Sequence, residues 1–175
     1  MRKILGSKFF ARETLIVAEN LLGKFIVRRQ GQTEIAYQIT EAEAYDGPQD
    51  KASHANRGKT SRNQIMFGPP GCFYIYLVYG FHQMLNIVTG MKSYPAAILI
   101  RGVTGVNGPG RVPKVLGIDK SFYAKIATQK TGLWFEDWGA KISAKQIKRL
   151  PRIGVAYAGP LWSAKKYRFK LMQEN

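Results

Sequence analysis

Apolar residues recur along most of the chain with the period of strands, and one segment near the N-terminus has the period of a helix. Residues 8–22 place apolar side chains at helical spacing before Gly23, which predicts an amphipathic helix. Runs of β-branched and aromatic residues predict strands over residues 24–29, 34–45, 72–79, 84–89 and 96–103. Gly31 marks the turn of a hairpin between the first two strands.

The rest of the pattern completes the predicted fold. Short helices are expected over residues 112–116 and 143–149, and a further strand over 153–157. Residues 46–71 are polar and rich in glycine and proline, and irregular loops of this length are usually functional or disordered. Because most strands follow one another through short turns, we predict an α+β fold with a single domain over residues 1–175. Its curved, mostly antiparallel β-sheet would be open and barrel-like, with helices flanking it.

One predicted strand carries two carboxylates and a tyrosine on a single face. Side chains alternate along a strand, so Glu41, Glu43 and Tyr45 share one face, while Ala42 and Ala44 lie on the other. This arrangement suits a strand that lines a cleft. The spacing alone favours the alternative, an edge strand with two glutamates in solvent, because most glutamates are exposed.

The charge of the chain points to a polyanionic partner. Lys and Arg total 27 against 11 Asp and Glu, which gives a formal net charge of +16. Nine basic residues and no acidic residue lie within 141–170, whereas residues 41–50 hold four of the acids. This asymmetry favours nucleic acid over an anionic membrane or simple solubility. With no apolar run near the roughly 20 residues that span a bilayer and no signal peptide, we expect a cytoplasmic protein.

The residue inventory predicts neither a metal nor a cofactor. Cys72 is the single cysteine, and His54 and His82 are too far apart in sequence to show metal-ligand spacing. The glycine-rich residues 102–110 match neither the P-loop pattern nor the dinucleotide fingerprint.

Several short motifs occur in a fixed order along most of the chain. They are residues 18–29 (AENLLGKFIVRR), 41–48 (EAEAYDGP), 53–54 (SH), 62–63 (RN), 70–71 (PG), 74–80 (YIYLVYG), 86 (N), 99–101 (LIR), 107–111 (NGPGR), 151–155 (PRIGV) and 166–169 (KYRF). In this order they resemble the alkyladenine (3-methyladenine) DNA glycosylases, the methylpurine glycosylases of base-excision repair. No single motif is decisive, but together they cover most of the chain.

The resemblance implies three catalytic positions. Glu43 matches the general base that activates water. Arg101 matches an arginine that helps to place this water, and the backbone carbonyl of Ile153 matches a third contact to it. Glu41 is the nearest competitor of Glu43, and the motif favours Glu43.

It also implies residues that hold the damaged base. Tyr45 and Tyr76 match side chains that stack on the faces of the flipped base, and the backbone around His54 would meet its edge. Asn86 matches a residue thought to crowd out the amino group of normal guanine, and Tyr79 matches the side chain that fills the gap in the duplex. Tyr76 and Tyr79 are three residues apart, so a regular strand places them on opposite faces, in agreement with separate roles.

The implied activity is hydrolysis of the N-glycosidic bond of alkylated or deaminated purines in double-stranded DNA, which leaves an abasic site. The class includes 3-methyladenine, 7-methylguanine, hypoxanthine and ethenoadenine. A purine inside a duplex must be turned out of the stack to be attacked, and aromatic faces suit its π surface. We expect a monomer without lyase activity, which is nucleoid-associated if the protein is bacterial. No residue is identified as the general acid for the leaving base.

Two alternative functions remain open, and the chain departs from the family pattern at one place. The basic charge is equally consistent with a non-catalytic nucleic-acid-binding module. A glycoside hydrolase with Glu41 and Glu43 as its acid and base is less favoured, because most sugars are neutral. Only five residues separate Arg101 from Asn107, where family members usually carry a longer helical insertion.

Overall fold

One long strand organises the sheet. The computed structural model describes residues 2–172, and in it β3 (Thr33–Asp46) pairs with β2 (Phe25–Gln30) and then with β10 (Arg168–Leu171) along one edge. β6 (Ala96–Val103) occupies its other edge. The strand order is β1-β8-β2-β3-β6-β5-β4, with β9 joined to β10 and β7 joined to β6, and all pairs are antiparallel. The predicted α+β fold with an open antiparallel sheet is therefore confirmed.

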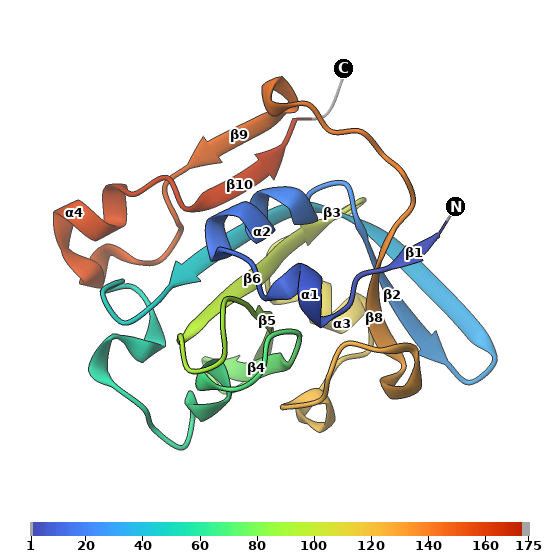
Figure 1. Ribbon diagram of the computed structural model, residues 1–175, viewed down its shortest axis with the longest axis horizontal. Helices are drawn as coiled ribbons and strands as arrows, with labels where there is room; N and C mark the ends of the chain where they lie inside the picture. The colour runs from blue at the N-terminus through green and yellow to red at the C-terminus, as the bar shows by residue number, and fades with distance from the viewer. Residues whose placement is uncertain (1, 173–175) are drawn as a thin grey trace.

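The other elements flank or extend this sheet (Figure 1). The remaining strands are β1 (Lys3–Ile4), β4 (Phe73–Val78), β5 (His82–Val88), β7 (Val106–Asn107), β8 (Leu133–Asp137) and β9 (Ile147–Leu150). The α-helices are α1 (Ser7–Phe10), α2 (Thr14–Leu21), α3 (Arg111–Val115) and α4 (Gly159–Ala164). Short 3-10 helices are η1 (His54–Arg57), η2 (Gln64–Phe67), η3 (Lys120–Phe122), η4 (Gln129–Thr131), η5 (Ala144–Gln146) and η6 (Ala156–Ala158). Within residues 2–172, no helix is long and apolar enough to cross a bilayer.

The hydrophobic core fills one face of the sheet, beneath α1 and α2. Phe10 of α1 and Leu21 of α2 are completely buried, and they belong to the same cluster as Ala42 and Ala44 of β3. Figure 1 shows both helices lying across this face. The opposite face of β3 is thereby left to the polar side chains of Glu41, Glu43 and Tyr45.

A paired irregularity decides which residues of β3 and β6 face the core. On β3, Ile35, Tyr37 and Ile39 contact the core, but beyond this point the core residues are Ala42 and Ala44. On β6 the core residues are Ile98, Ile100 and then Val103. Register shifts occur on both sides of Glu41, so each strand carries two successive residues turned away from the core at the same place. Without this change of phase, Glu43 would point into the hydrophobic cluster.

The predicted helix over residues 8–22 is divided into α1 and α2. The carbonyl oxygen of Phe10 accepts a hydrogen bond from the backbone N–H of Gly90 at 2.9 Å, in place of the helical N–H four residues on. Arg12 donates from Nε to the carbonyl of Phe9 at 3.0 Å. The break allows Phe10 to stay buried while α2 follows β3.

Two predictions for the C-terminal part are wrong. Residues 143–149 contain η5 and the start of β9 in place of a helix, because β9 pairs with β10 over Ile147–Leu150. Residues 153–157 form no strand, because they contain a bend at Ile153 and Gly154 and the start of η6. The pattern also missed β8, in which Trp134 and Phe135 are completely buried. The predicted domain bounds include residues 1 and 173–175, which lie outside the described part.

Candidate active site

Glu43 is a carboxylate with no exposure to solvent that is held by three separate donors. Its Oε1 accepts a hydrogen bond from the backbone N–H of Ile153 at 2.9 Å, and its Oε2 accepts one from the Tyr45 hydroxyl at 3.0 Å. Arg101 brings a guanidinium nitrogen to within 3.5 Å of Oε1. Burial raises the pKa of Glu43, although the charge of Arg101 and both hydrogen bonds oppose the rise. A buried carboxylate with a raised pKa is typical of a general base.

Glu41 positions arginines, and it is not a second free acid. Its Oε1 accepts hydrogen bonds from Arg101 at 3.2 Å and from Arg168 at 2.9 Å. Arg168 also donates from Nε to the carbonyl of Pro151 at 2.8 Å, so it ties the loop that precedes Ile153 to the sheet. This role makes Glu41 a poor candidate for the acid of a glycoside hydrolase pair.

A second buried ion pair holds the same loop from behind. Arg152 and Asp50 both have side chains with no exposure to solvent, and two nitrogens of Arg152 donate to the two carboxylate oxygens of Asp50, at 2.5 and 2.8 Å. Arg152 also donates to the carbonyl of Ala44 at 2.8 Å and lies over the ring of Tyr45, 4.8 Å from its centroid. Ile153, whose N–H reaches Glu43, is the next residue in the chain.

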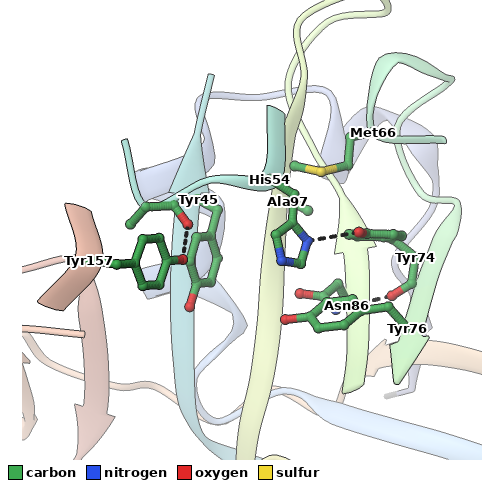
Figure 2. Close-up of a pocket in the computed structure, with 9 residues that line it drawn as sticks. Tyr45, His54, Met66, Tyr74, Tyr76, Asn86, Ala97 and Tyr157 are labelled. Atoms are coloured by element: carbon green, nitrogen blue, oxygen red, sulfur yellow. Dashed lines mark hydrogen bonds between the residues drawn. The ribbon is translucent and has the colours of Figure 1, made fainter. Parts of the chain in front are cut away.

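A narrow cavity opens beside Tyr45 (Figure 2). It is lined by aromatic and small residues from four parts of the chain: Tyr45, Ala52, His54, Met66, Tyr74, Tyr76, Asn86, Ala97 and Tyr157. Figure 2 shows Tyr45 and Tyr157 on one side of it, and Tyr76, Asn86 and Tyr74 on the other. Its volume is about 40 Å³, room for only a few waters, so a purine could enter only if the walls moved apart.

The structure thus gathers all four predicted pocket residues, Tyr45, His54, Tyr76 and Asn86, around one cavity. Glu43 does not line it, but it lies one hydrogen bond away through the Tyr45 hydroxyl. Among the described residues, no group of three or more His, Cys, Asp or Glu side chains is placed to hold a metal ion. The aromatic lining of the cavity favours a flat, aromatic ligand.

His54 is fixed in the cavity wall and favours its neutral form. Its Nδ1 lies 2.8 Å from the Tyr74 hydroxyl, and its ring meets the edge of Tyr76 at 4.7 Å between centroids. Burial lowers the pKa of His54, and the nearby charge of Arg62 lowers it further. The amide of Asn63 donates to the carbonyls of His54 and Gly58 at 2.8 and 2.9 Å, which orders the backbone on this side.

The tip of the β4–β5 hairpin carries exposed aromatic side chains. Tyr79 is 85% exposed and Phe81 is 70% exposed. Tyr79 and Gly80 both have positive φ, 52° and 78°, as the primed hairpin turns require. Because a tyrosine rarely adopts positive φ, its presence here suggests a function outside the folded core.

Sequence reasoning missed Tyr157, Asp50 and Arg152. Tyr157 lines the cavity and donates from its hydroxyl to the carbonyl of Ala52 at 2.8 Å. Its place was hidden because residues 153–157 were predicted to form a strand. Asp50 and Arg152 are separated by 102 positions, and no local pattern links them. The one available signal was that Asp50 is one of only two acidic residues in the predicted loop over residues 46–71.

Known proteins resemble the chain over most of its length. A family model described as "Methylpurine-DNA glycosylase (MPG)" matches residues 8–107 and 104–175. Three of the relatives bear the name "Putative 3-methyladenine DNA glycosylase". The one from Anaeromyxobacter dehalogenans (strain 2CP-C) is 41% identical, over 95% of this chain and 83% of the relative. Those from Methanocella arvoryzae and Rickettsia felis are 39% and 42% identical, over 89% and 84% of this chain and 86% and 85% of their own lengths.

The buried Asp50–Arg152 pair is expected to stabilise the fold. Asp50→Asn leaves the Arg152 guanidinium without a counter-charge in a site that water does not reach. The free energy of unfolding is expected to fall by about 3–5 kcal/mol. Urea denaturation at pH 7, followed by circular dichroism, measures this loss.

Asp137→Asn is the matched control. Asp137 pairs with Lys24 at 2.8 Å, but its side chain is 31% exposed. The same substitution there is expected to cost less than about 1 kcal/mol. Equal losses in the two variants would contradict the structural importance of the Asp50–Arg152 pair.

Proposed function

The chain belongs to the methylpurine-DNA glycosylase family, and from this membership we propose that it removes alkylated or deaminated purines from duplex DNA. The observation that carries the proposal is the pairing of a buried carboxylate, Glu43, with an adjacent cavity walled by tyrosines. The reaction would hydrolyse the N-glycosidic bond and leave an abasic site. The net charge of +16 would serve to hold the phosphate backbone.

Glu43 is proposed as the general base. Its raised pKa suits a group that takes a proton from water during attack on the sugar. Arg101, with Glu41 holding its other side, would fix the orientation of Glu43 and of that water. The carbonyl of Ile153 is proposed as a further contact to the water, since the N–H of this residue already binds Glu43. The negative charge would also stabilise the oxocarbenium-like sugar of the transition state.

The cavity is proposed to receive the flipped base. Tyr45 and Tyr76 approach from opposite sides and would stack on its two faces, with Tyr157 extending the side of Tyr45. The backbone near His54 would meet the edge of the base, and Asn86 would disfavour a purine that carries the amino group of guanine. The small volume of the cavity implies that the side chains separate when the base enters.

The charge of the damaged base determines whether its departure needs a proton from an acid. A 3-methyladenine or 7-methylguanine already carries positive charge and can leave without a proton from the protein. Hypoxanthine and ethenoadenine would need protonation at a ring nitrogen. No side chain of the cavity wall is proposed as that acid, so bases that already carry positive charge are the substrates that this chemistry favours most.

Tyr79 is proposed as the wedge that occupies the gap left in the duplex. It projects from a hairpin tip, three residues after the cavity wall residue Tyr76, so one strand would join base pocket and wedge. Aromatic side chains inserted between base steps are a known way to hold a duplex distorted. We also propose that the protein acts as a monomer on chromosomal DNA.

The first test is base release from duplex oligonucleotides that contain 7-methylguanine, hypoxanthine or ethenoadenine. Glu43→Gln is expected to lower the single-turnover rate by about 10²- to 10⁴-fold, the usual contribution of a general base. Glu34→Gln, on the exposed end of the same strand, is the matched control and should act like the wild type. Absence of release by the wild type, or undiminished release by Glu43→Gln, would leave a non-catalytic DNA-binding module as the better explanation.

The second test is the pH dependence of 7-methylguanine release. Because only the ionised form of Glu43 accepts a proton, kcat/KM should fall as the pH falls through the pKa of Glu43. Burial raises that pKa, so the acidic limb is expected above the ordinary value of 4.5. The residual activity of Glu43→Gln should lack this limb. A limb at or below 4.5 in the wild type would argue against Glu43 as the titrating base.

The third test separates the wedge from the fold. Tyr79→Gly removes an aromatic side chain from a position with φ of 52°, where glycine is unstrained. The melting temperature is therefore expected to stay the same or rise, while release from duplex DNA falls by about tenfold or more. Phe81→Gly, at the neighbouring exposed position, controls for the loss of any aromatic group. A fall in melting temperature with unchanged release would contradict the role of Tyr79.

A further inference from the structure

A second hollow lies beyond Glu41, on the side away from the aromatic cavity. It has a volume of about 270 Å³ and is lined by Thr40, Asn107, Lys148, Lys170, Leu171 and Met172. We propose that this groove binds one backbone phosphate of the damaged DNA strand, close to the damaged nucleotide. The inference rests on the proposed function for its choice of DNA, while the groove and its charges stand independently of it.

Two like charges face each other across this groove. Lys148 of β9 and Lys170 of β10 are direct partners in the antiparallel register, so their Cβ atoms lie about 4.5–5.5 Å apart. Like charges in such a pair destabilise a sheet. Among the described residues, neither lysine forms an ion pair, and both side chains are exposed. An anion between them would turn this repulsion into attraction.

The nearby carboxylate does not satisfy the lysines. Lys170 is the register partner of Glu41, but Glu41 is already bound by Arg101 and Arg168. The two arginines balance Glu41 and Glu43, which leaves the charges of Lys148 and Lys170 uncompensated. Thr40 and Asn107 add a hydroxyl and an amide to the lining, and neither side chain is engaged elsewhere in the described structure. Both groups can donate to phosphate oxygens.

The position of the groove along β3 matches the order of parts in a nucleotide. Tyr45 lines the cavity proposed for the base, Glu43 would act at the glycosidic bond, and Glu41 is followed by Lys170 on the neighbouring strand. Each step along β3 covers two residues, roughly 7 Å. The groove therefore begins about 7 Å beyond Glu43, where the glycosidic bond would lie. Successive phosphates of one strand advance about 3.4 Å along the axis of B-DNA, so for a strand that follows β3 this distance corresponds to about two nucleotides from the sugar of the damaged nucleotide.

The β6–β7 turn lies beside the groove and is short. β6 ends at Val103 and β7 begins at Val106, with Val103 and Val106 paired in register. Asn107 is exposed beside Gly102, where an added Cβ would come within 3.1 Å of Thr40 Oγ1. The same Cβ would lie 3.6 Å from Asn107 Oδ1, so glycine at position 102 leaves room for both of these side chains in the lining of the groove.

The test compares two double variants in binding to a duplex with a single hypoxanthine. Lys148→Gln/Lys170→Gln is expected to weaken binding about 5- to 20-fold near 0.1 M salt and to lower the slope of log K against log salt by about 1. Lys3→Gln/Lys8→Gln removes equal charge from β1 and α1, at the far edge and on the core-covering side of the sheet, and should change binding much less. The melting temperature of the first variant should stay the same or rise. Equal weakening in both variants would overturn the proposal and leave general charge as the cause.

Single methylphosphonate linkages in the damaged strand locate the phosphate. One linkage within about two nucleotides of hypoxanthine should weaken binding of the wild type but not of Lys148→Gln/Lys170→Gln. The proposal would be overturned if no single methylphosphonate linkage weakened binding more than the others. It would also be overturned if the lysine substitutions weakened binding to duplex RNA of the same sequence but not to duplex DNA. Binding needs no base release, so a protein that binds in this way without releasing a base would refute the glycosylase function and retain the phosphate site.

Discussion

The structure depends on the neutralisation of one buried carboxylate. Glu43 has no access to water, so its charge must be met by donors from the protein. The donors come from β6, from β3 itself and from the loop at Ile153. Segments more than 100 residues apart in sequence therefore meet at the two carboxylate oxygens of Glu43. Each donor is itself held, Arg101 by Glu41 and the Ile153 loop by Arg152 and Arg168. The cost of burying Glu43 is thus spread over two further carboxylates and three arginines.

This network lies on one face of the sheet, and the two faces differ in polarity. The face beneath α1 and α2 is filled with apolar side chains, whereas the opposite face of β3 orders ionic and aromatic groups in a line. The proposed base cavity, the carboxylate and the lysine groove follow one another along that line. A sheet supplies such a series with little backbone freedom, and this rigidity suits a reaction that needs groups placed to within about 0.5 Å.

The sequence predicted best what depends on neighbouring residues. The strand over residues 96–103 was predicted with the observed ends, and the shared face of Glu41, Glu43 and Tyr45 was deduced from alternation. Residues 143–157 were predicted wrongly because β9 is selected by its pairing with β10 and because the Ile153 N–H binds Glu43 in place of a strand partner. Asp50 and Arg152 could not be paired, since nothing local favours a contact across 102 positions. The resemblance supplied the remaining site residues, whose roles stay proposals.

The change of phase in β3 and β6 restricts how such a chain can vary in length. On β3, Thr40 and Glu41 separate the core residues Ile39 and Ala42, where regular alternation would leave only one residue between them. On β6, two residues likewise separate Ile100 from Val103. A single insertion or deletion in either strand would turn half of it over and exchange carboxylates for core side chains. An insertion in one strand at this point would therefore need a compensating change in the other strand to keep both phases in register. The register of β3 and β6 at Glu41 therefore fixes which side chains face the site, whatever the lengths of the surrounding loops.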